Sequence, residues 1–595
     1  MSPAEGFLLD VRCVAHFYVL FAIRQWCTQL VSAFYTCQVV HWNPEHLNIE
    51  IRVGCVITTL SRVPPFRRGS LCEPTKNSAY FCIMKILNGQ QIKQWDQYTI
   101  DHEPVSSIEL MERAAGKCVD WLEEKNLLQY PFRILCGKGN NGGDGLAIAR
   151  MLLQKQCTVT VHILEFGHLG TEDFQTNLKR LHQEKGADIH FIQGEENFPE
   201  LNKNEIVIDA LFGSGLNRPL EAVTAALVEH VNNSGCKVVA VDVPSGLPVD
   251  HSAKGNVIIR ADYTLSFQLY KLAFLLSENG EFVGEVHVLD IGLHPEFYDS
   301  VESCYELTDE KIISGIYKTR KAFAHKGNFG HALLITGSYG KMGAAVLCAK
   351  SCLRTGAGLT TCHIPKCGYE VLQTAVPEAM VMVDFNSSIV TKIDEDLAKY
   401  SCIGLGPGIG TASETKRLLN EILDVYKKPV VLDADALNVI SSDKKLLGKI
   451  PPRSILTPHP KEFERLFGKV ENEHDRLQLA QQNANHLKVV VVLKGHHTFI
   501  TTPGNKGYFN NTGNAGMAKG GSGDVLTGIL TALVCQGYDP VDASILGVHL
   551  HGLAGDMAAK KWSMEAMIAG DIIDNLGEAF SSISDQIISP GKLNY

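Results

Sequence analysis

Short apolar segments that end in glycine or aspartate recur along this chain, and each is followed by a segment with helical spacing of apolar residues. In the first half, residues 131–136 form a strand, residues 137–145 a glycine-rich loop, residues 146–153 a helix and residues 159–164 the next strand. From residue 320 the same order repeats, with strands expected to begin near residues 332, 402, 429 and 489. Strands that alternate with helices form parallel sheets covered on both faces. The sequence therefore predicts an α/β protein with two doubly wound α/β domains.

The length of the chain also indicates more than one domain. It has 595 residues, whereas a typical domain has about 150. Residues 294–311 are polar, contain Pro295 and four acids, and are predicted to link domains at 84–293 and 312–595. Residues 1–83 hold six of the 17 cysteines and lack sustained periodicity. We expect them to be a non-native or disordered extension before a biological start at Met84, with a membrane anchor as the alternative.

The charge balance excludes one class of function. Lys+Arg number 55 and Asp+Glu 65, and with a net charge of −10 and no basic block we expect no nucleic-acid binding. The absence of a Cys-x-x-Cys pair and of zinc-spaced clusters favours reduced thiols and a cytoplasmic protein that binds no membrane. The pairs His496–His497 and His549–His551 are interpreted as packing or substrate contacts.

A glycine-rich stretch at residues 511–524 leads directly into an apolar run at 525–534 with helical spacing. Backbone N–H groups at a helix start can bind an anion, and glycines let a phosphate approach closely. Asp524, beside that anion site, could take a proton from a substrate hydroxyl. The alternative is a plain turn in which Asp524 caps the helix.

The first half carries a glycine motif and three acids of interest. Gly137, Gly139 and Gly142 fit G-x-G-x-x-G, and Glu165 follows the next strand, as in dinucleotide-binding enzymes. No further residues for hydride transfer accompany this motif. Asp144, Asp209 and Asp242 are expected beyond the carboxyl ends of parallel strands, where ligands bind in such sheets.

Four motifs in the first half, CGKGNNGGDG, DALFGSGL, VDVPSGL and ILNGQQIKQWDQYTI…LMERAAG, resemble those of the NAD(P)H-hydrate epimerase domain, over roughly residues 84–293. The resemblance implies a Rossmann-like fold, with Asp242 as the catalytic acid or base. It implies potassium bound by Asn141, Asp209 and Ser245. The residues that it implies for the hydrated nucleotide are Asn140, Asn141, Gly142, Gly143, Asp144, Gly213, Ser214, Gly215, Leu216, Asn217, Arg218, Pro219 and Asp242.

Five motifs in the second half, GxGPGxG, LDADALN, TPHPKEF, LKG and NxTGNxxMAKGGSGD, occur in the order of the ADP-dependent NAD(P)H-hydrate dehydratases. These are ribokinase-like proteins, and the resemblance covers roughly residues 306–580. It implies that Asp524 is the catalytic base and that magnesium enters with ADP. The implied contacts to the hydrated nucleotide are Ala344, Gly408, His459 and Asp524. The implied contacts to the adenine nucleotide are Lys494, Gly495, His496, His497, Thr498 and Gly523.

Together these resemblances predict a fused repair enzyme, both isomerase and lyase, that acts on hydrated NADH and NADPH with ADP. The first domain would interconvert the R and S forms, and the second would dehydrate the S form. A homo-oligomer is expected. One alternative is a ribokinase-type small-molecule kinase fused to a nucleotide-binding module without catalytic activity.

Overall fold

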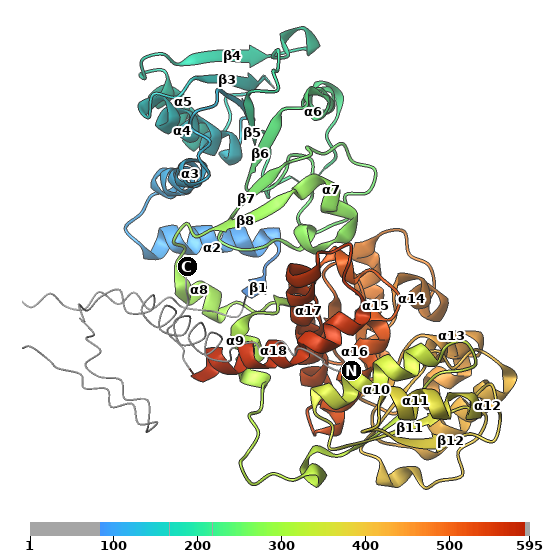
Figure 1. Cartoon of the computed structure of the whole chain (residues 1–595). Coiled ribbons are helices and arrows are strands. Elements are labelled where there is room, and N and C mark those ends of the chain that lie inside the picture. Colours follow the sequence, from blue (N-terminus) through green and yellow to red (C-terminus); the bar gives the residue numbers. More distant parts are fainter. Residues whose placement is uncertain (1–83, 166, 217, 589–595) are drawn as a thin grey trace, which may run out of the picture. The chain divides into compact units, whose positions relative to one another are not determined.

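The computed structural model describes residues 84–588 except residues 166 and 217, so the predicted extension at 1–83 and the predicted contact Asn217 lie outside the described residues. These residues form two sheets with helices on both faces of each (Figure 1). The prediction of two doubly wound α/β sheets is confirmed. Within the described part of the chain, no helix combines the length and the apolar character that a membrane span needs.

The first sheet has seven strands in the order β4-β3-β2-β5-β6-β7-β8, and every neighbouring pair is parallel. One face packs against α3, α4 and α5, and the other against α6. The strands are β2 (Phe132–Cys136), β3 (Val159–Leu164), β4 (Asp188–Ile192), β5 (Ile206–Ala210), β6 (Lys237–Val241), β7 (Tyr263–Phe267) and β8 (Glu285–Leu289). The helices of this half are α2 (Gly89–His102), α3 (Ser107–Glu124), α4 (Asn140–Gln154), α5 (Glu172–Leu181), α6 (Ala222–Ser234) and α7 (Gly280–Val283).

Helix α4 begins at Asn140, so the prediction that residues 137–145 are a loop was wrong. The cause is tertiary packing, which overrides the poor helix propensity of Asn and Gly. A Cβ atom at Gly142 would lie 1.8 Å from the Gly137 carbonyl oxygen, and one at Gly145 would lie 2.6 Å from the Ala210 Cβ atom. Only glycines let the start of α4 press onto β2 and β5. Asp144 therefore projects from the second turn of a helix rather than from a strand end.

The second sheet has eleven strands in the order β1-β9-β18-β17-β16-β15-β14-β13-β10-β11-β12. Strands β10 to β16 pair in parallel, and β17, β18, β9 and β1 extend one side. The strands are β1 (Met84–Ile86), β9 (Tyr305–Leu307), β10 (His331–Ile335), β11 (Leu359–Ile364), β12 (Met380–Val383), β13 (Cys402–Leu405), β14 (Val430–Leu432), β15 (Ile455–Leu456), β16 (Val490–Leu493), β17 (Phe499–Thr501) and β18 (Gly507–Phe509).

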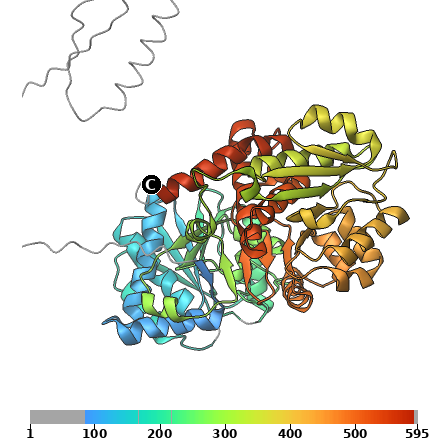
Figure 2. The ribbon, with the colours of Figure 1, turned by 90° about the horizontal axis from the view of Figure 1, so that it is seen from below.

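Two hydrophobic clusters cover the two faces of this sheet. One joins it to α10, α16, α17 and α18, which lie together although α10 is far from the others in sequence (Figure 2). The other joins it to α12, α13, α14 and α15. The helices of this half are α8 (Pro295–Ser300), α9 (Glu310–Ile316), α10 (Met342–Thr355), α11 (Tyr369–Ala375), α12 (Ser413–Val425), α13 (Asp435–Ser442), α14 (Pro460–Phe467), α15 (Glu473–Leu487), α16 (Ser522–Cys535), α17 (Pro540–Trp562) and α18 (Ala569–Ile588).

The structure departs from the predicted domain boundaries at two points. The expected linker at 294–311 contains α8 and β9, and β9 is a strand of the second sheet. The segment at Met84, where the first domain was predicted to begin, forms strand β1, which pairs antiparallel with β9. Ile86 and Leu307 are both buried in one hydrophobic cluster, which explains why this short strand joins the second sheet.

Candidate active sites

A pocket of about 140 Å³ opens at the carboxyl edge of the first sheet. Four residues predicted to contact the hydrated nucleotide, Asn140, Asp144, Ser214 and Asp242, line this pocket together. The rest of the lining is largely apolar and includes Trp95 from α2. Three sequence motifs, one at the start of α4 and two in the loops after β5 and β6, therefore meet around one cavity.

Asp242 follows β6 and has a positive φ of 65°. Its carboxylate lies 2.6 Å from the Nζ atom of Lys271, which is 1% exposed. The backbone N–H groups of Ser214 and Phe267 also donate to it, each at 3.3 Å. Lys271 was not among the predicted site residues, although it is the only charged residue between positions 263 and 276. A charged residue within an apolar run was the available signal.

Two further acids line the same pocket. Burial raises the pKa of Asp144 well above its ordinary value, and Asp242, Asp96 and Asp173 raise it further. Burial also raises the pKa of Asp96 to about 7, with Asp242 raising it and Lys271 lowering it. Asp96, on α2, was not among the predicted site residues. Asp96 lies within the motif IKQWDQYTI, which resembles the epimerase domain, but the resemblance implied no role for this acid.

The three residues predicted to bind potassium lie close to the same edge. Asp209 is completely buried and accepts hydrogen bonds from the Ser245 hydroxyl at 2.6 Å and the Ser245 backbone N–H at 2.7 Å. A Cβ atom at Gly213 would lie 3.0 Å from the Asn141 side-chain oxygen, so Asn141 covers this turn. The buried Asn141 amide nitrogen has no hydrogen-bond partner among the described residues. Burial raises the pKa of Asp209 to about 6, although hydrogen bonds from Ser245 and Leu211 lower it.

Most of the remaining residues predicted to contact the hydrated nucleotide in the first half do not line this pocket. Of the described residues at 213–219, only Ser214 lines the pocket, and Gly213, Gly215, Leu216, Arg218 and Pro219 do not. Lys138 forms an ion pair with Glu165, the residue at the expected ribose-binding position. That carboxylate is thus already bound to a lysine, which weighs against a dinucleotide fingerprint of the dehydrogenase type.

In the second half, a hydrogen-bond network joins three elements at the carboxyl edge of the sheet. The Nζ atom of Lys494, after β16, lies 2.7 Å from the Asp433 carboxylate, and the hydroxyl of Thr527 donates to the same carboxylate at 2.8 Å. A Cβ atom at Gly523 would lie 3.5 Å from the Lys494 Nζ atom. The predicted nucleotide contacts Lys494 and Gly523 are therefore neighbours. Asp433 and Thr527 were not predicted, although Asp433 lies within the LDADALN motif.

Asp524 is the third residue of α16 and not its cap. The cap is Gly521, with φ 97° and no side-chain hydrogen bond, so the alternative that Asp524 caps the helix was wrong. Burial raises the pKa of Asp524 to about 6, Asp433 raises it further, and Lys494 lowers it. A carboxylate with such a pKa is mostly ionised at neutral pH and still basic enough to accept a proton.

Of the predicted substrate contacts of the second half, His459 lies near this network, and Ala344 and Gly408 lie beside each other. His459 caps α14 and its Nε2 atom lies 3.5 Å from Glu462, which lies 4.0 Å from the Lys494 Nζ atom. A Cβ atom at Gly408 would lie 3.2 Å from the Ala344 Cβ atom, so these two predicted contacts are also adjacent.

The turn after β16 holds the other predicted nucleotide contacts. The His496 and His497 Nδ1 atoms lie 3.2 Å apart, and the hydroxyl of Thr498 donates to the Gly495 carbonyl. Burial and the neighbouring His496 lower the pKa of His497 to about 4. Across residues 84–588, apart from the two undescribed positions, no group of three or more His, Cys, Asp or Glu side chains could hold a metal ion.

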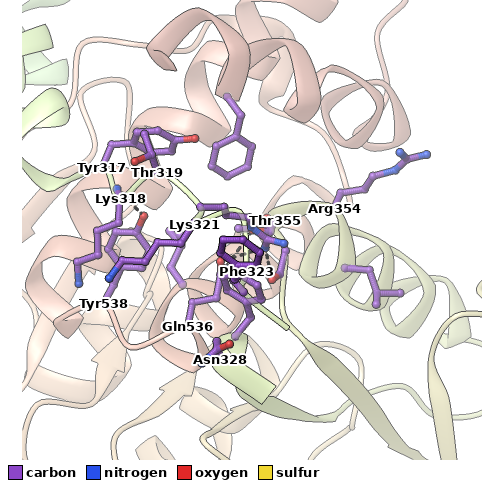
Figure 3. A pocket seen from close by; sticks show the side chains of 17 residues that line it. Tyr317, Lys318, Thr319, Lys321, Phe323, Asn328, Arg354, Thr355, Gln536 and Tyr538 are labelled. Carbon is purple, nitrogen blue, oxygen red and sulfur yellow. Dashed lines mark hydrogen bonds between the residues drawn. The ribbon is translucent and has the colours of Figure 1, made fainter. Parts of the chain in front are cut away.

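A larger cavity, of about 840 Å³, lies elsewhere in the second half (Figure 3). It is formed by the segment before β10 and by the ends of α10 and α16, and its lining includes Lys318, Lys321 and Arg354. It contains none of the predicted site residues, and its position before a strand places it away from the carboxyl edge, where ligands bind in such folds. Its size alone does not make it the active site.

The chain matches known proteins in both halves. A family model described as NAD(P)H-hydrate dehydratase matches residues 332–577, and one described as YjeF-related protein N-terminus matches residues 107–273. A solved structure of an ADP/ATP-dependent NAD(P)H-hydrate dehydratase from Bacillus subtilis, co-crystallised with ATP and Mg²⁺, is 30% identical. That match covers 47% of this chain and 98% of the other, with a TM-score of 0.42.

Relatives also align with both halves at once. A bifunctional NAD(P)H-hydrate repair enzyme of Moorella thermoacetica is 34% identical over 520 residues, which cover 85% of this chain and 98% of that protein. An enzyme of the same name from Thermofilum pendens is 33% identical, with coverages of 85% and 98%. Because these alignments span nearly the full length of each relative, the chain belongs to the family of bifunctional NAD(P)H-hydrate repair enzymes.

Proposed function

We propose that the first half of the chain interconverts the R and S forms of hydrated NADH and NADPH, and that the second half dehydrates the S form at the expense of ADP. The observation that carries the proposal is the presence of two separate acid sites, each at the carboxyl edge of its own sheet. Asp242 lies beside Lys271 in the first, and Asp524 lies near Asp433 and Lys494 in the second. Two distinct sites on one chain fit two consecutive steps on one metabolite.

The first site suits proton transfer at a hydroxylated carbon beside a nitrogen. In the hydrated nucleotide, C6 carries a hydroxyl next to the ring nitrogen. Once the hydroxyl oxygen is protonated, the nitrogen lone pair can expel it as water. Water can then return on the other face of the ring and give up a proton to Asp242. The apolar lining of the pocket limits competing water.

The second site suits activation of a poor leaving group. Asp524 takes the proton of the C6 hydroxyl, and the β-phosphoryl group passes from ADP to the hydroxyl oxygen, which leaves AMP. The C6–O bond then breaks with release of phosphate, and C5 loses a proton to that phosphate as the C5=C6 double bond forms. The backbone N–H groups of Gly521 to Gly523, at the start of α16, are placed to stabilise charge on the transferred group. Lys494, adjacent to Gly523, adds a positive charge.

The residues present fit the two implied cations. Asp209 is a fully buried carboxylate with no lysine or arginine partner among the described residues, and the Ser245 hydroxyl lies beside it. The Asn141 amide lies against Gly213, in the turn that follows Asp209 and β5. Such oxygen ligands suit potassium. In the second half, Asp433, Asp435, Glu462 and Asp524 lie near one another with two lysines, Lys341 and Lys494. Because no three acids in the described part of the chain form a metal site by themselves, magnesium would be held mainly by the phosphates of ADP, with Asp433 or Asp524 as a further ligand.

A direct assay tests the proposal. The purified chain is incubated with a mixture of R and S hydrated NADH and with ADP or ATP, and recovery of NADH absorbance is followed. Complete recovery of both forms with a nucleoside diphosphate is expected. Recovery of only the S form would remove the epimerase assignment. Release of a phosphorylated alcohol without recovery of NADH would instead indicate a ribokinase-type kinase.

We expect potassium to stabilise the first half more at pH 7.5 than at pH 5. The pKa of Asp209 is raised from its ordinary value of 3.8 to about 6, so the folded state loses stability as pH rises through this range. A bound cation favours the ionised carboxylate and offsets that loss. The measurement is the thermal midpoint in KCl against tetramethylammonium chloride at equal ionic strength. In the Asn141→Ala variant the potassium effect should shrink, and an equal shift at both pH values would contradict the site.

We also propose a homo-oligomeric assembly and a cytoplasmic location. All eleven cysteines among the described residues are free, which fits a reducing compartment. Nucleotide preference is measured by steady-state rates with each nucleotide, and assembly by sedimentation.

A further inference from the structure

An epimerase must move protons on both faces of the reacting carbon, so one carboxylate is not enough. Departure of the hydroxyl needs an acid, and return of water on the opposite face needs a base. The pocket at the carboxyl edge of the first sheet contains three carboxyl groups, Asp96, Asp144 and Asp242. The differences between their surroundings indicate which two share this task.

Asp242 has the surroundings of a proton acceptor. It receives the Lys271 ammonium group at 2.6 Å, and the N–H groups of Ser214 and Phe267 donate to it. Lys271 is itself fixed by the Ser266 hydroxyl at 2.6 Å and the Phe267 carbonyl at 2.9 Å. This cation is almost fully buried, so it offers its charge to Asp242 without competition from water.

Asp96 has the opposite surroundings. It is half-buried in the pocket wall, and among the described residues its carboxyl makes no hydrogen bond or ion pair. Burial and the charge of Asp242 raise its pKa to about 7, against a lowering by Lys271. It can therefore exist in both the acid and the ionised form near neutral pH, and a group that must give and take the same proton needs this property.

Helix α2 (blue in Figure 1) fixes the position of Asp96. The side chain of Asn88 caps this helix and the side chain of Gln91 returns a hydrogen bond to the Asn88 N–H. Trp95, the residue before Asp96, is buried and donates from its indole to the His294 carbonyl at 2.8 Å. These anchors, which all precede Asp96 in the chain, fix the part of α2 that carries its carboxyl at the pocket.

Asp144 is less suited to the same task. It is 8% exposed, and burial together with Asp242, Asp96 and Asp173 holds its pKa well above the ordinary value. Its ionised form, which a base needs, is disfavoured by burial and by the three neighbouring carboxylates. These surroundings favour a role as a hydrogen-bond donor to the substrate.

We infer that Asp96 is the second catalytic residue of the epimerase site, the partner of Asp242 on the other proton transfer. This inference rests on the proposed function of the first half. Asp96 protonates the departing hydroxyl oxygen, the C6–O bond breaks, and the nitrogen lone pair forms an N=C6 double bond as water leaves. A water molecule then adds to C6 on the other face, its proton passes to Asp242, and the double-bond electrons return to nitrogen. The roles reverse for the opposite direction.

The test is the rate of R-to-S conversion in the full chain, corrected for the uncatalysed reaction. Asp96→Asn should lower this rate about 10²–10⁴-fold, the usual cost of losing an acid–base group. Asp96→Glu keeps the carboxyl and should stay within about tenfold of the parent. Dehydration of the S form should be unchanged in both variants. Asp101→Asn, an exposed acid on the same helix, is the matched control and should leave the epimerase rate unchanged.

The pH dependence of the epimerase rate distinguishes a catalytic role of Asp96 from a purely structural one, because only loss of a catalytic acid changes that dependence. The parent should lose epimerase rate as pH rises through about 7, because Asp96 is then no longer an acid, and Asp96→Asn should lack this limb. If the parent itself does not interconvert the two forms, the proposed function fails. If the parent is active and Asp96→Asn stays within a few-fold of it, the inference is overturned. Equal losses in Asp96→Asn and Asp96→Glu would also overturn it.

Discussion

Dehydration of hydrated NADH should fall about 10²–10⁴-fold when Asp524 is replaced by asparagine, while R and S interconversion continues. Asparagine keeps the size of the side chain and cannot accept the hydroxyl proton. The start of α16 should survive because its cap is Gly521 and does not involve the side chain at 524. The negative charges of Asp433 and Asp435 repel the Asp524 carboxylate, so removing the charge at position 524 should not destabilise the fold. Affinity for ADP should hold or rise slightly, since a negative charge near the phosphates is gone.

A matched control exists on the next helix. Asp542 is the third residue of α17, as Asp524 is of α16, and both side chains are half-buried. Asp542→Asn should therefore reproduce any general effect of losing an acid in a first helical turn, without loss of dehydration. The measurements are NADH recovery by absorbance and ADP affinity by calorimetry. A variant at 524 that still dehydrates within a few-fold of the parent would exclude Asp524 as the base. Loss of ADP binding would mean that this side chain shapes the loop.

The same site predicts how dehydration depends on pH. Asp524 acts in its ionised form, and its pKa is raised from 3.8 to about 6. The dehydration rate should therefore rise with pH through about 6 and level off above 7. A rate that is flat between pH 5 and pH 8 would show that no group with this pKa acts as the base.

Interconversion of the R and S forms should fall about 10²–10⁴-fold in Asp242→Asn, with dehydration of the S form nearly unchanged. Asparagine tolerates the positive φ of 65° at this position, and its side-chain oxygen can still accept a hydrogen bond from Lys271. It cannot accept a proton from water. The measurement is the rate of R-to-S conversion, with the dehydration of pure S form as the internal reference.

The choice of asparagine over alanine matters for stability. Asp242→Ala would leave the buried Lys271 ammonium group without its carboxylate, and breaking a buried pair typically costs about 3–5 kcal/mol. The double variant Asp242→Ala, Lys271→Met should recover part of the lost thermal stability and remain inactive as an epimerase. Glu205→Gln, which breaks the Arg133–Glu205 ion pair just before β5, is the matched control and should keep epimerase activity. Loss of both reactions in Asp242→Asn would contradict two separate sites.

The sequence was most informative where function depends on local motifs. The strands that precede Asp242, Asp433 and Lys494 could be predicted from their apolar runs, and parallel pairing then brings their carboxyl ends to one edge. Lys271 could not be predicted in this way, because its partner Asp242 lies 29 residues earlier and on another element. Asp96 was missed for the same reason, since its surroundings exist only when α2 packs over the pocket.

Local signals also failed where packing between distant segments decides the structure. The start of α4 at Asn140 depends on the close approach of Gly142 to Gly137, just after β2, and of Gly145 to Ala210 of β5. These contacts form only when the sheet is assembled. Strand β1 has three residues, too few for a periodic pattern, and its partner β9 is far along the chain.

The pairing of β1 with β9 has a consequence for synthesis of the protein on the ribosome. Met84 pairs with Leu307, so β1 has no partner strand until the whole first sheet has been translated. At about 5–20 residues per second this delay is roughly 10–45 s. The first half can therefore fold before the pairing between β1 and β9 has formed. The β1–β9 pair can form once β9 has left the ribosome. It joins the rest of the second sheet only after β18 (Gly507–Phe509) has been translated, because β9 pairs with β18. A chain shortened past β1 would leave the Leu307 edge of this sheet without its partner strand.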